Sequence, residues 1–347
     1  MIEKETHYWT IDPNNIQQEN KKIAEAATLL QAGEVVAFPT ETVYGLGADA
    51  TNSDAVAKIF QAKGRPADNP LIVHVAEKAQ IKTYVTEIPQ IAEKLIDAFM
   101  PGPLTVILKS NQKIASIVTA GLDTIAIRIP DHTVARALIE ASGRPLAAPS
   151  ANTSGKPSPT QAIHVFQDLN QKIAGIVDGG EAGVGVESTV VDCTGELPLI
   201  LRPGGVTKEE MEAVVGEVLV DQALKQSTEQ PKAPGMKYNH YEPDAPLHLI
   251  QGDTAFFQAQ IDQLISESKK VGVIASEELA NELQASHIKQ IGTRSDLKTI
   301  AKHLYDALRF FNEKEIDIIL CETFTDQGVG QAIMNRLQKA ATKEIKQ

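Results

Sequence analysis

The 347-residue sequence is poor in several features that would place it in a common class of protein. Its two cysteines, Cys193 and Cys321, lie far apart, each within an apolar run. Isolated cysteines of this kind are typical of small core side chains in a reducing compartment, which argues against a disulfide framework or a cysteine metal site. No apolar run approaches the roughly 18 residues of a membrane-spanning helix. We therefore expect a soluble, cytoplasmic protein without a membrane partner.

Positive charge is scarce as well. The chain carries 33 Lys and Arg against 45 Asp and Glu, a net charge of -12, and aromatic residues make up 5% of it. Because nucleic-acid binding by counterion release requires a broad basic surface, we expect weak or no direct binding of nucleic acid. Any site for an anion must therefore be local.

The standard nucleotide and hydrolase motifs are also missing. The sequence has no G-x-x-x-x-G-K-[ST] loop, and no G-x-G-x-x-G is followed by an acidic residue about 20 positions later. It has neither a G-x-S-x-G elbow nor an H-E-x-x-H pair. A bound nucleotide would therefore be held by scattered side chains.

Two cations stand in front of a predicted buried strand. Lys63 and Arg65 open the stretch KGRPADNPLIVH, and a strand is expected over 69–75. The helix before them is predicted to be capped by Ser53 and to end at Gly64. This places the two cations at a helix end, next to the start of a strand.

A mixed α/β fold follows from the alternation of elements. The apolar strand at 35–38 runs into the loop PTETVYGLGADA, and further strands are expected at 102–108 and 124–130. Helical stretches at 91–99 and 132–142 separate them. At this length, two domains of about 150 residues each are expected.

Side-chain alternation identifies polar residues within these strands. The isoleucines of 124–130 share one face, so Thr124 and Arg128 share the other. A buried arginine is costly unless an anion meets it, and either a ligand or a structural carboxylate would serve. His74 lies opposite the valines of its strand, where a satisfied core histidine is favoured over a ligand-binding one.

Polar residues also follow several strands. Ser150 and Asn152 lie in APSANTSGKPSPT, and Arg202 ends the strand of LILRPGG. Strand ends are where open α/β sheets place their ligands. A loop with the composition of APSANTSGKPSPT is usually solvated surface, and one such cluster alone means little. Together with Lys63, Arg65 and Arg128, however, these residues predict a polyphosphate site.

The motifs PTETVYGLGADA, KGRPADNPLIVHV, PGPLTVIL, IAIRIPDH, APSANTSGKPSPT, ESTVVDCT and LRPGG, in this order, resemble the YrdC/Sua5 family of L-threonylcarbamoyladenylate synthases. The resemblance covers about residues 15–210. The stretch APGMKYNHYEP (233–243) is similar to the linker of the longer Sua5 members, except that Asn239 replaces the usual arginine. The family fold is a twisted mixed α/β sheet with flanking helices.

The resemblance implies a catalytic domain over 1–210, a linker or lid over 211–245 and a C-terminal domain over 246–347. In the last part, strands alternate with helical stretches at 255–268, 277–285, 296–314 and 331–342. This pattern predicts a smaller Rossmann-like α/β domain without the dinucleotide fingerprint.

The resemblance also implies a reaction. ATP, L-threonine and bicarbonate give threonylcarbamoyl-AMP and pyrophosphate, with Mg2+ accompanying ATP and no metal bound directly by the protein. The product passes to the tRNA threonylcarbamoyl transferase machinery, which makes N6-threonylcarbamoyladenosine in tRNAs that read ANN codons.

Site residues follow from the motifs one by one. The implied catalytic residues are Lys63, Arg65, Ser150 and Asn152. The implied threonine-binding residues are Thr40, His74, Arg128, Ala148 and Ser188. The implied ATP-binding residues are Arg65, Asn69, Thr124, Ser150, Ser158, Arg202, Tyr238 and Tyr241.

Alternatives remain at this point. An RNA-binding module could use the same basic cavity, and a carbamoyl transferase acting on carbamoyl phosphate would share its anion chemistry. The apolar residues of 233–243 fit a lid over the cavity, and they fit equally a segment that docks the second domain.

Overall fold

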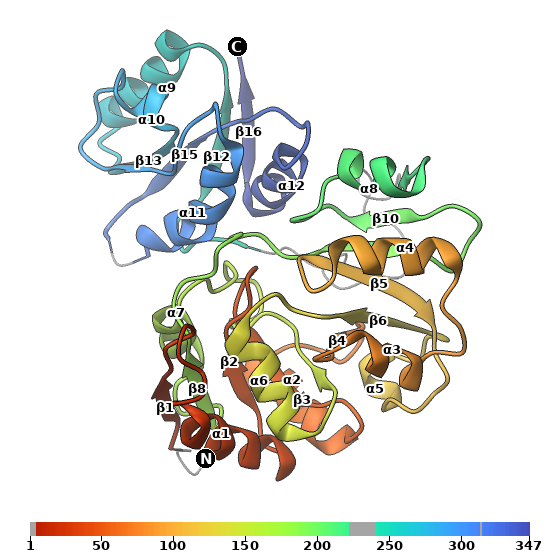
Figure 1. Cartoon of the computed structure of the whole chain (residues 1–347). Coiled ribbons are helices and arrows are strands. Elements are labelled where there is room, and N and C mark those ends of the chain that lie inside the picture. The colour runs from red at the N-terminus through yellow and green to blue at the C-terminus, as the bar shows by residue number, and fades with distance from the viewer. Residues whose placement is uncertain (1–4, 222–240, 313) are drawn as a thin grey trace. The chain divides into compact units, whose positions relative to one another are not determined.

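The computed structural model describes residues 5–221, 241–312 and 314–347 (Figure 1). These residues form two compact units, one made of residues 5–154 and 158–221 and the other of residues 155–157 and 241–347. The domain limits at 210 and 246 remain predictions. Most of the expected linker, including Asn239, lies outside the described residues.

The larger unit is built on a mixed sheet, as the fold prediction requires. In the described residues it is 11-stranded, in the order β1-β8-β2-β3-β7-β4-β6-β5-β9-β10-β11. Its strands are β1 (His7–Thr10), β2 (Val36–Phe38), β3 (Gly45–Asp49), β4 (Ile72–His74), β5 (Leu104–Lys109), β6 (Thr124–Arg128), β7 (Leu146–Ala147), β8 (Gly175–Asp178), β9 (Thr189–Asp192), β10 (Leu199–Arg202) and β11 (Leu219–Val220). Its helices are α1 (Asn20–Gln31), α2 (Ser53–Lys63), α3 (Lys78–Tyr84), α4 (Gln90–Phe99), α5 (Ser116–Thr119), α6 (Thr133–Ser142), α7 (Ala162–Leu169) and α8 (Lys208–Val215).

Alternation along the strands sends apolar side chains to both faces of this sheet. On β2, Val36 and Phe38 join a cluster with residues of α1 and α6, which lie side by side (Figure 1). Ala37 and the preceding Val35 join the cluster on the opposite face, which includes residues of α2 and α4. Both faces of β2 are therefore buried, as expected of a short, fully apolar strand.

A different part of the α1/α6 face carries polar residues. His74 pairs in register with Arg128, and Ala126 of β6 pairs with Ile107 of β5. Register partners point to the same side of a sheet. His74 and Arg128 therefore share this face with a small apolar cluster, made of Ile72, Ile107, Ala126, Val190 and Leu201.

Helix α2 explains how the chain reaches Lys63. Its N-cap is Asn52, whose side chain accepts hydrogen bonds from the amides of Asp54 and Ala55. The prediction of Ser53 as the cap was wrong by one residue, because the asparagine side chain reaches the same orphan N–H groups from the extended position before the helix. The helix ends at Gly64, which adopts φ +63° as predicted.

The smaller unit is a parallel α/β sheet. In the described residues it is 5-stranded, in the order β14-β13-β15-β12-β16, with every pair parallel. This confirms the Rossmann-like prediction. Its elements are β12 (Leu247–Gln251), α9 (Thr254–Ser266), β13 (Val271–Ala275), α10 (Glu277–Ala280), β14 (Ile288–Gln290), α11 (Leu297–Phe310), β15 (Ile318–Glu322), α12 (Gly330–Ala340) and β16 (Lys343–Lys346).

Three residues from the first half of the chain belong to this smaller unit. The Pro157 carbonyl accepts hydrogen bonds from Nε and Nη2 of the buried Arg309, at 3.1 and 2.5 Å. The Gly155 carbonyl accepts from the amide of Glu242 at 2.9 Å. These contacts give the segment between Asn152 and Ser158, two of the predicted site residues, a fixed backbone conformation.

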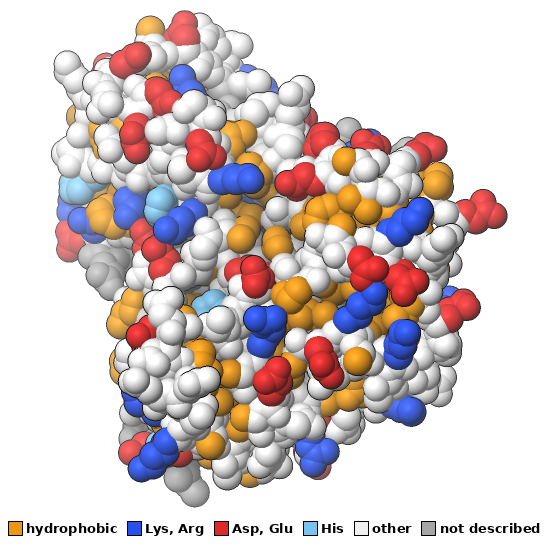
Figure 2. All heavy atoms as spheres, viewed as in Figure 1, with side chains coloured by type: hydrophobic (Ala, Val, Ile, Leu, Met, Phe, Trp, Pro, Cys, Tyr) orange, Lys and Arg blue, Asp and Glu red, His pale blue; other side chains and the backbone are white. Residues whose placement is uncertain are grey.

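The surface of the molecule carries charges of both signs. Figure 2 shows acidic and basic side chains interspersed over the face in view, without an expanse of one sign. Among the described residues, no helix combines the length and the apolar character needed to cross a membrane.

Gly204 lies where two backbone segments meet. A Cβ atom at this position would stand 2.3 Å from the Glu187 carbonyl oxygen and 2.4 Å from backbone atoms of Ser188 and Thr189. Backbone atoms cannot turn aside as a flexible side chain can. The absence of a side chain at Gly204 therefore permits the approach of Arg202 to Ser188.

We predict that Gly204→Ala lowers the free energy of unfolding by about 3 kcal/mol or more, because the added methyl group displaces backbone. Gly183→Ala is the matched control, since a Cβ there meets nothing within 4 Å. It should change stability by less than about 0.5 kcal/mol. Urea unfolding of both variants checks this, and equal stabilities would contradict the close approach.

Candidate functional site

Arg128 is the buried cation at the centre of the site. Arg128 is the last residue of β6, and the residue as a whole is 3% exposed. Its Nε donates to the Gly102 carbonyl at 3.2 Å, and its Nη2 lies 2.6 Å from Glu41 Oε1. The structural carboxylate considered from the sequence is thus present. An arginine carries five N–H donors, so these contacts leave donors for a second anion.

His74 lies beside Arg128 on the neighbouring strand β4. Its Nδ1 is 3.3 Å from the Ile72 carbonyl, and its ring meets Phe38 edge to face. Burial above all, and then the charge of Arg128, lower the pKa of His74 to about 3. The imidazole is therefore neutral at physiological pH, and its contacts suit a satisfied core histidine. Its role in threonine binding stays a prediction.

Two other predicted threonine-binding residues lie on segments next to this pair. Thr40 is buried, 2.9 Å from the Thr42 hydroxyl, and donates to the Val43 carbonyl at 2.6 Å. The amide of Ala148 donates to the Ile72 carbonyl of β4 at 2.9 Å. Thr40 directly precedes Glu41, which pairs with Arg128 at the end of β6, and Ala148 is bound at the first residue of β4.

Ser188 and Arg202 form a second buried cluster. Arg202 Nη2 donates to the Ser188 carbonyl at 2.8 Å and to its hydroxyl at 3.1 Å, and Nε donates to the same carbonyl at 3.1 Å. The Ser188 hydroxyl also lies 2.7 Å from that of Thr105 on β5. In the structure, Ser188, which is predicted to bind threonine, thus contacts Arg202, which is predicted to bind the nucleotide.

Lys63 holds the loop that carries Ser150 and Asn152. Its Nζ donates to the Ser150 carbonyl at 2.5 Å and to the Asn152 carbonyl at 2.6 Å. The Ser150 hydroxyl donates to Asn152 Oδ1 at 2.6 Å. Three of the four predicted catalytic residues therefore lie together, and the buried ammonium of Lys63 fixes the conformation of the loop.

The remaining predicted nucleotide residues in the larger unit differ in exposure. Ser158 is 1% exposed and donates to Glu187 Oε1 at 2.7 Å. Asn69 is fully buried. Thr124 is half-buried at the start of β6, on the face that also carries Arg128. All three are placed by the sheet or its connecting loops.

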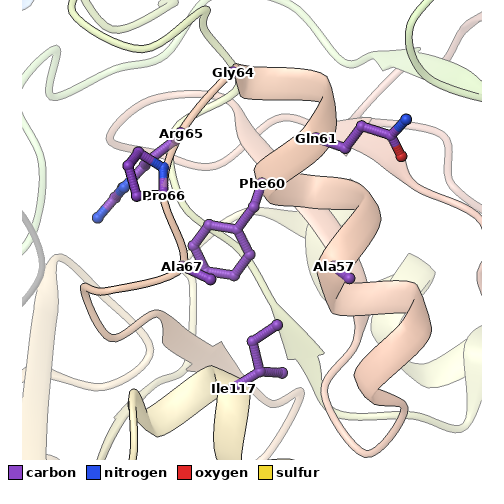
Figure 3. A pocket seen from close by; sticks show the side chains of 8 residues that line it. All are labelled: Ala57, Phe60, Gln61, Gly64, Arg65, Pro66, Ala67 and Ile117. Atoms are coloured by element: carbon purple, nitrogen blue, oxygen red, sulfur yellow. The ribbon is translucent and has the colours of Figure 1, made fainter.

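Arg65, the fourth predicted catalytic residue, follows the end of α2, and its amide donates to the Phe60 carbonyl at 3.0 Å. It lines a hollow of about 500 Å³, whose other lining residues are Ala57, Phe60, Gln61, Gly64, Pro66, Ala67 and Ile117 (Figure 3). In this view the guanidinium points away from the Phe60 ring and Ile117. The charged end of Arg65 therefore faces away from the apolar wall of the hollow.

Comparison with known proteins gives the family. Residues 28–204 match the Sua5/YciO/YrdC family, described as telomere recombination, and residues 206–342 match the threonylcarbamoyl-AMP synthase C-terminal domain. The chain belongs to the Sua5/YrdC family. It is 53% identical to a threonylcarbamoyl-AMP synthase of Bacillus subtilis (strain 168), over 97% of this chain and 98% of that protein.

Solved structures agree with this membership. The crystal structure of Pyrococcus abyssi Sua5 complexed with L-threonine matches with a TM-score of 0.90 and 45% identity, covering 99% of each chain. A variant of the same archaeal protein, with a histidine and a tyrosine replaced by alanine, matches with a TM-score of 0.92 and 44% identity over 99% of each chain. The two-unit Sua5 fold predicted from the sequence is thereby confirmed.

Three side chains of this Sua5 family member were missed from the sequence. Glu41 pairs with Arg128, Thr105 contacts Ser188, and Glu187 accepts from Ser158. Alternation could have placed Thr105 on the polar face of its strand. Glu41 and Glu187 lie in loops, where periodicity carries no signal.

Of the two tyrosines assigned to the nucleotide, Tyr238 lies outside the described residues. Tyr241 is 5% exposed within the smaller unit, with its ring centroid 5.2 Å from that of Tyr305. This packing favours the docking alternative for Tyr241. Its contact with a nucleotide stays a prediction.

The described residues contain no group of three or more His, Cys, Asp or Glu side chains suited to hold a metal ion. Buried carboxylates do occur singly, as in Glu187 beside Ser158. A metal ion bound to the phosphates of a nucleotide requires no such group, because the phosphate oxygens are its ligands.

We predict that His74 makes stability fall as the pH falls. Its pKa of about 3 in the folded protein lies below the ordinary value of 6.5 expected in the unfolded chain. The neutral His74 therefore makes its full contribution to the free energy of unfolding above about pH 6.5. This contribution is lost as the pH falls towards 3, by at most about 1.4 kcal/mol per pH unit.

Urea unfolding of the wild type and His74→Gln at pH 7, 6 and 5 measures this. The stability difference between the two proteins should shift against the wild type by about 1 kcal/mol per pH unit below pH 6. A constant difference, or a His74 resonance that titrates near pH 6 by NMR, would contradict the buried neutral imidazole.

Proposed function

We propose that this protein makes threonylcarbamoyl-AMP and pyrophosphate from L-threonine, bicarbonate and ATP. The activity is that named for the Bacillus subtilis relative, with which the chain shares 53% identity over nearly its full length. The archaeal relative that binds L-threonine has the same fold over 99% of the chain. Both units of the present chain are thus shared with proteins of this name.

The single observation that carries the proposal is the placement of two buried arginines on one sheet face. Arg128 lies on β6, on the same face as its register partner His74 of β4. Arg202 pairs in register with Val190, and Val190 faces the same side of the sheet as Ile107 and Ala126. Arginine forks match carboxylate and phosphate oxygens. One face therefore presents a cation suited to the amino-acid carboxylate and another suited to the phosphates.

The reaction consists of two bond-forming steps. The threonine nitrogen adds to the carbon of CO2 and loses a proton, or adds to the carbon of bicarbonate with loss of water, and either path gives an N-carboxylate. An oxygen of this carboxylate then attacks the α-phosphorus of ATP. The bond from that phosphorus to the bridging oxygen breaks, and pyrophosphate leaves. Alignment and neutralisation of phosphate charge account for most catalysis in transfers of this kind.

No protein nucleophile takes part in this scheme. Burial raises the pKa of the Cys193 thiol to about 12 and that of Cys321 well above its usual range. Neither thiol is ionised at neutral pH, and the thiolate is the reactive form. Neither cysteine is therefore suited to be the attacking group, which agrees with a scheme in which the substrate supplies it.

The residues divide between the two substrates. In this proposal, threonine is bound by Thr40, His74, Arg128, Ala148 and Ser188, and ATP by Arg65, Asn69, Thr124, Ser150, Ser158, Arg202, Tyr238 and Tyr241. Lys63 and Asn152 fix the loop of Ser150 beside the phosphates. Mg2+ arrives with ATP and neutralises phosphate charge.

The product is a reactive carbamic anhydride, so an acceptor must follow promptly. We infer that it passes to the tRNA threonylcarbamoyl transferase machinery for N6-threonylcarbamoyladenosine in tRNAs that read ANN codons. A cytoplasmic reaction suits the two buried, unpaired cysteines. The charges of mixed sign on the face shown in Figure 2 give no support to the RNA-binding alternative.

Pyrophosphate release tests the proposal. It should require L-threonine, bicarbonate and ATP together, and mass spectrometry should detect threonylcarbamoyl-AMP. Release of phosphate from carbamoyl phosphate, or of pyrophosphate in the absence of threonine, would refute the assigned reaction.

We predict that Arg65→Lys lowers kcat/KM at least about tenfold although the charge is kept, because an ammonium cannot replace a bidentate fork on phosphate. Arg144→Lys is the matched control, since its half-exposed side chain pairs with Asp49 at 3.5 Å. It should keep wild-type rates. Wild-type kinetics in Arg65→Lys would remove Arg65 from the site.

A further inference from the structure

Glu41 has a carboxylate that the rest of the described structure does not fully satisfy. Its backbone is fixed, since the amide of Val184 donates to its carbonyl at 2.8 Å. Its Oε1 lies 2.6 Å from Arg128 Nη2, with 12% of its side chain and 4% of that of Arg128 exposed. The two groups are thus a buried ion pair within the site.

Short separation does not make this pair a well-aligned hydrogen bond. Within the described residues, both carboxylate oxygens of Glu41 are buried without an aligned donor, and Arg128 Nη2 is buried without an aligned acceptor. More than 90% of buried polar groups in native proteins are hydrogen-bonded, and a bare carboxylate is costly. The arrangement indicates a place for donors that arrive with a ligand.

The groups around Glu41 limit the nature of that ligand. Burial lowers the pKa of the nearby His132, and burial with the charge of Arg128 lowers that of His74. Both imidazoles are therefore neutral at physiological pH and repel no incoming cation. The site offers one carboxylate and one guanidinium side by side.

We propose that Glu41 receives the ammonium group of the amino-acid substrate while Arg128 receives its carboxylate. This inference rests on the proposed function, in which L-threonine is that substrate. A free α-amino acid carries opposite charges on groups attached to one carbon, so its site requires opposite charges a few ångströms apart. Glu41 and Arg128 meet this requirement at 2.6 Å.

Such a contact gives Glu41 a part in the chemistry. Once the bound ammonium has lost a proton, its nitrogen is the atom that forms the bond to the carbon of CO2 or bicarbonate. A carboxylate with a fixed backbone places this nitrogen relative to the α-carbon and the side-chain hydroxyl. Glu41 is then a specificity residue, because it selects a free amino group over compounds of the same shape that lack one.

Calorimetric titration with two ligands tests this. The probes are L-threonine and (R)-3-hydroxybutyrate, which keeps the carboxylate and the hydroxyl but has no amine. The wild type should bind threonine at least about 30-fold more tightly, the lower limit for truncating a buried charge pair. Glu41→Gln should bring the two affinities within about threefold.

Glu34→Gln serves as the matched control, because Glu34 pairs with Lys58 at 2.9 Å elsewhere in the same unit. It should keep the wild-type preference for threonine. Thermal unfolding of each variant is measured alongside. Should Glu41→Gln fail to fold, the ratio of the two affinities in the wild type decides the question.

The outcomes separate this inference from the proposed function. Equal binding of both ligands to the wild type, or an equal loss of both in Glu41→Gln, would show that Glu41 serves Arg128 as a counter-ion alone and would overturn the inference. Absence of threonine binding to the wild type would refute the proposed function, and the inference with it. A preference that is lost in Glu41→Gln supports both.

Discussion

The burial of one positive charge governs the design of the larger unit. Arg128 lies on the interior face of β6, where water cannot solvate its guanidinium. The Gly102 carbonyl and the Glu41 carboxylate compensate the charge of Arg128, and the neighbouring His74 remains neutral. The loop that supplies Glu41 must therefore lie against the sheet for the charge of Arg128 to be compensated.

The same solution recurs at the other cations. Lys63 is 3% exposed and Arg202 is 6% exposed, and both donate to backbone carbonyls of loops that end at the site. Their side chains are held by the fold before any substrate binds. Donors fixed in this way require little reorganisation when charge develops on phosphate or carboxylate oxygens. The loops are thus positioned by hydrogen bonds from buried cations as well as by apolar packing.

Sequence periodicity predicted the parts of this arrangement that strands carry. The alternation in 124–130 placed Arg128 on the face opposite the isoleucines, but it could not name Glu41, which lies in a loop distant in sequence. The edge strands β1 and β16 were not predicted, because their exposed, mostly polar residues lack an apolar repeat and pair according to their neighbours. Likewise, no local signal assigns Gly155–Pro157 to the smaller unit.

That three-residue segment has a consequence for the order of events during synthesis. The Pro157 carbonyl is bound by Arg309, which is added 152 residues later. At ribosomal rates of about 5–20 residues per second, the interval is about 8–30 s. By the time Arg309 is added, the nascent chain contains every described strand of the larger sheet. The Pro157 carbonyl therefore receives its partner only after the strands on both sides of this segment have been made.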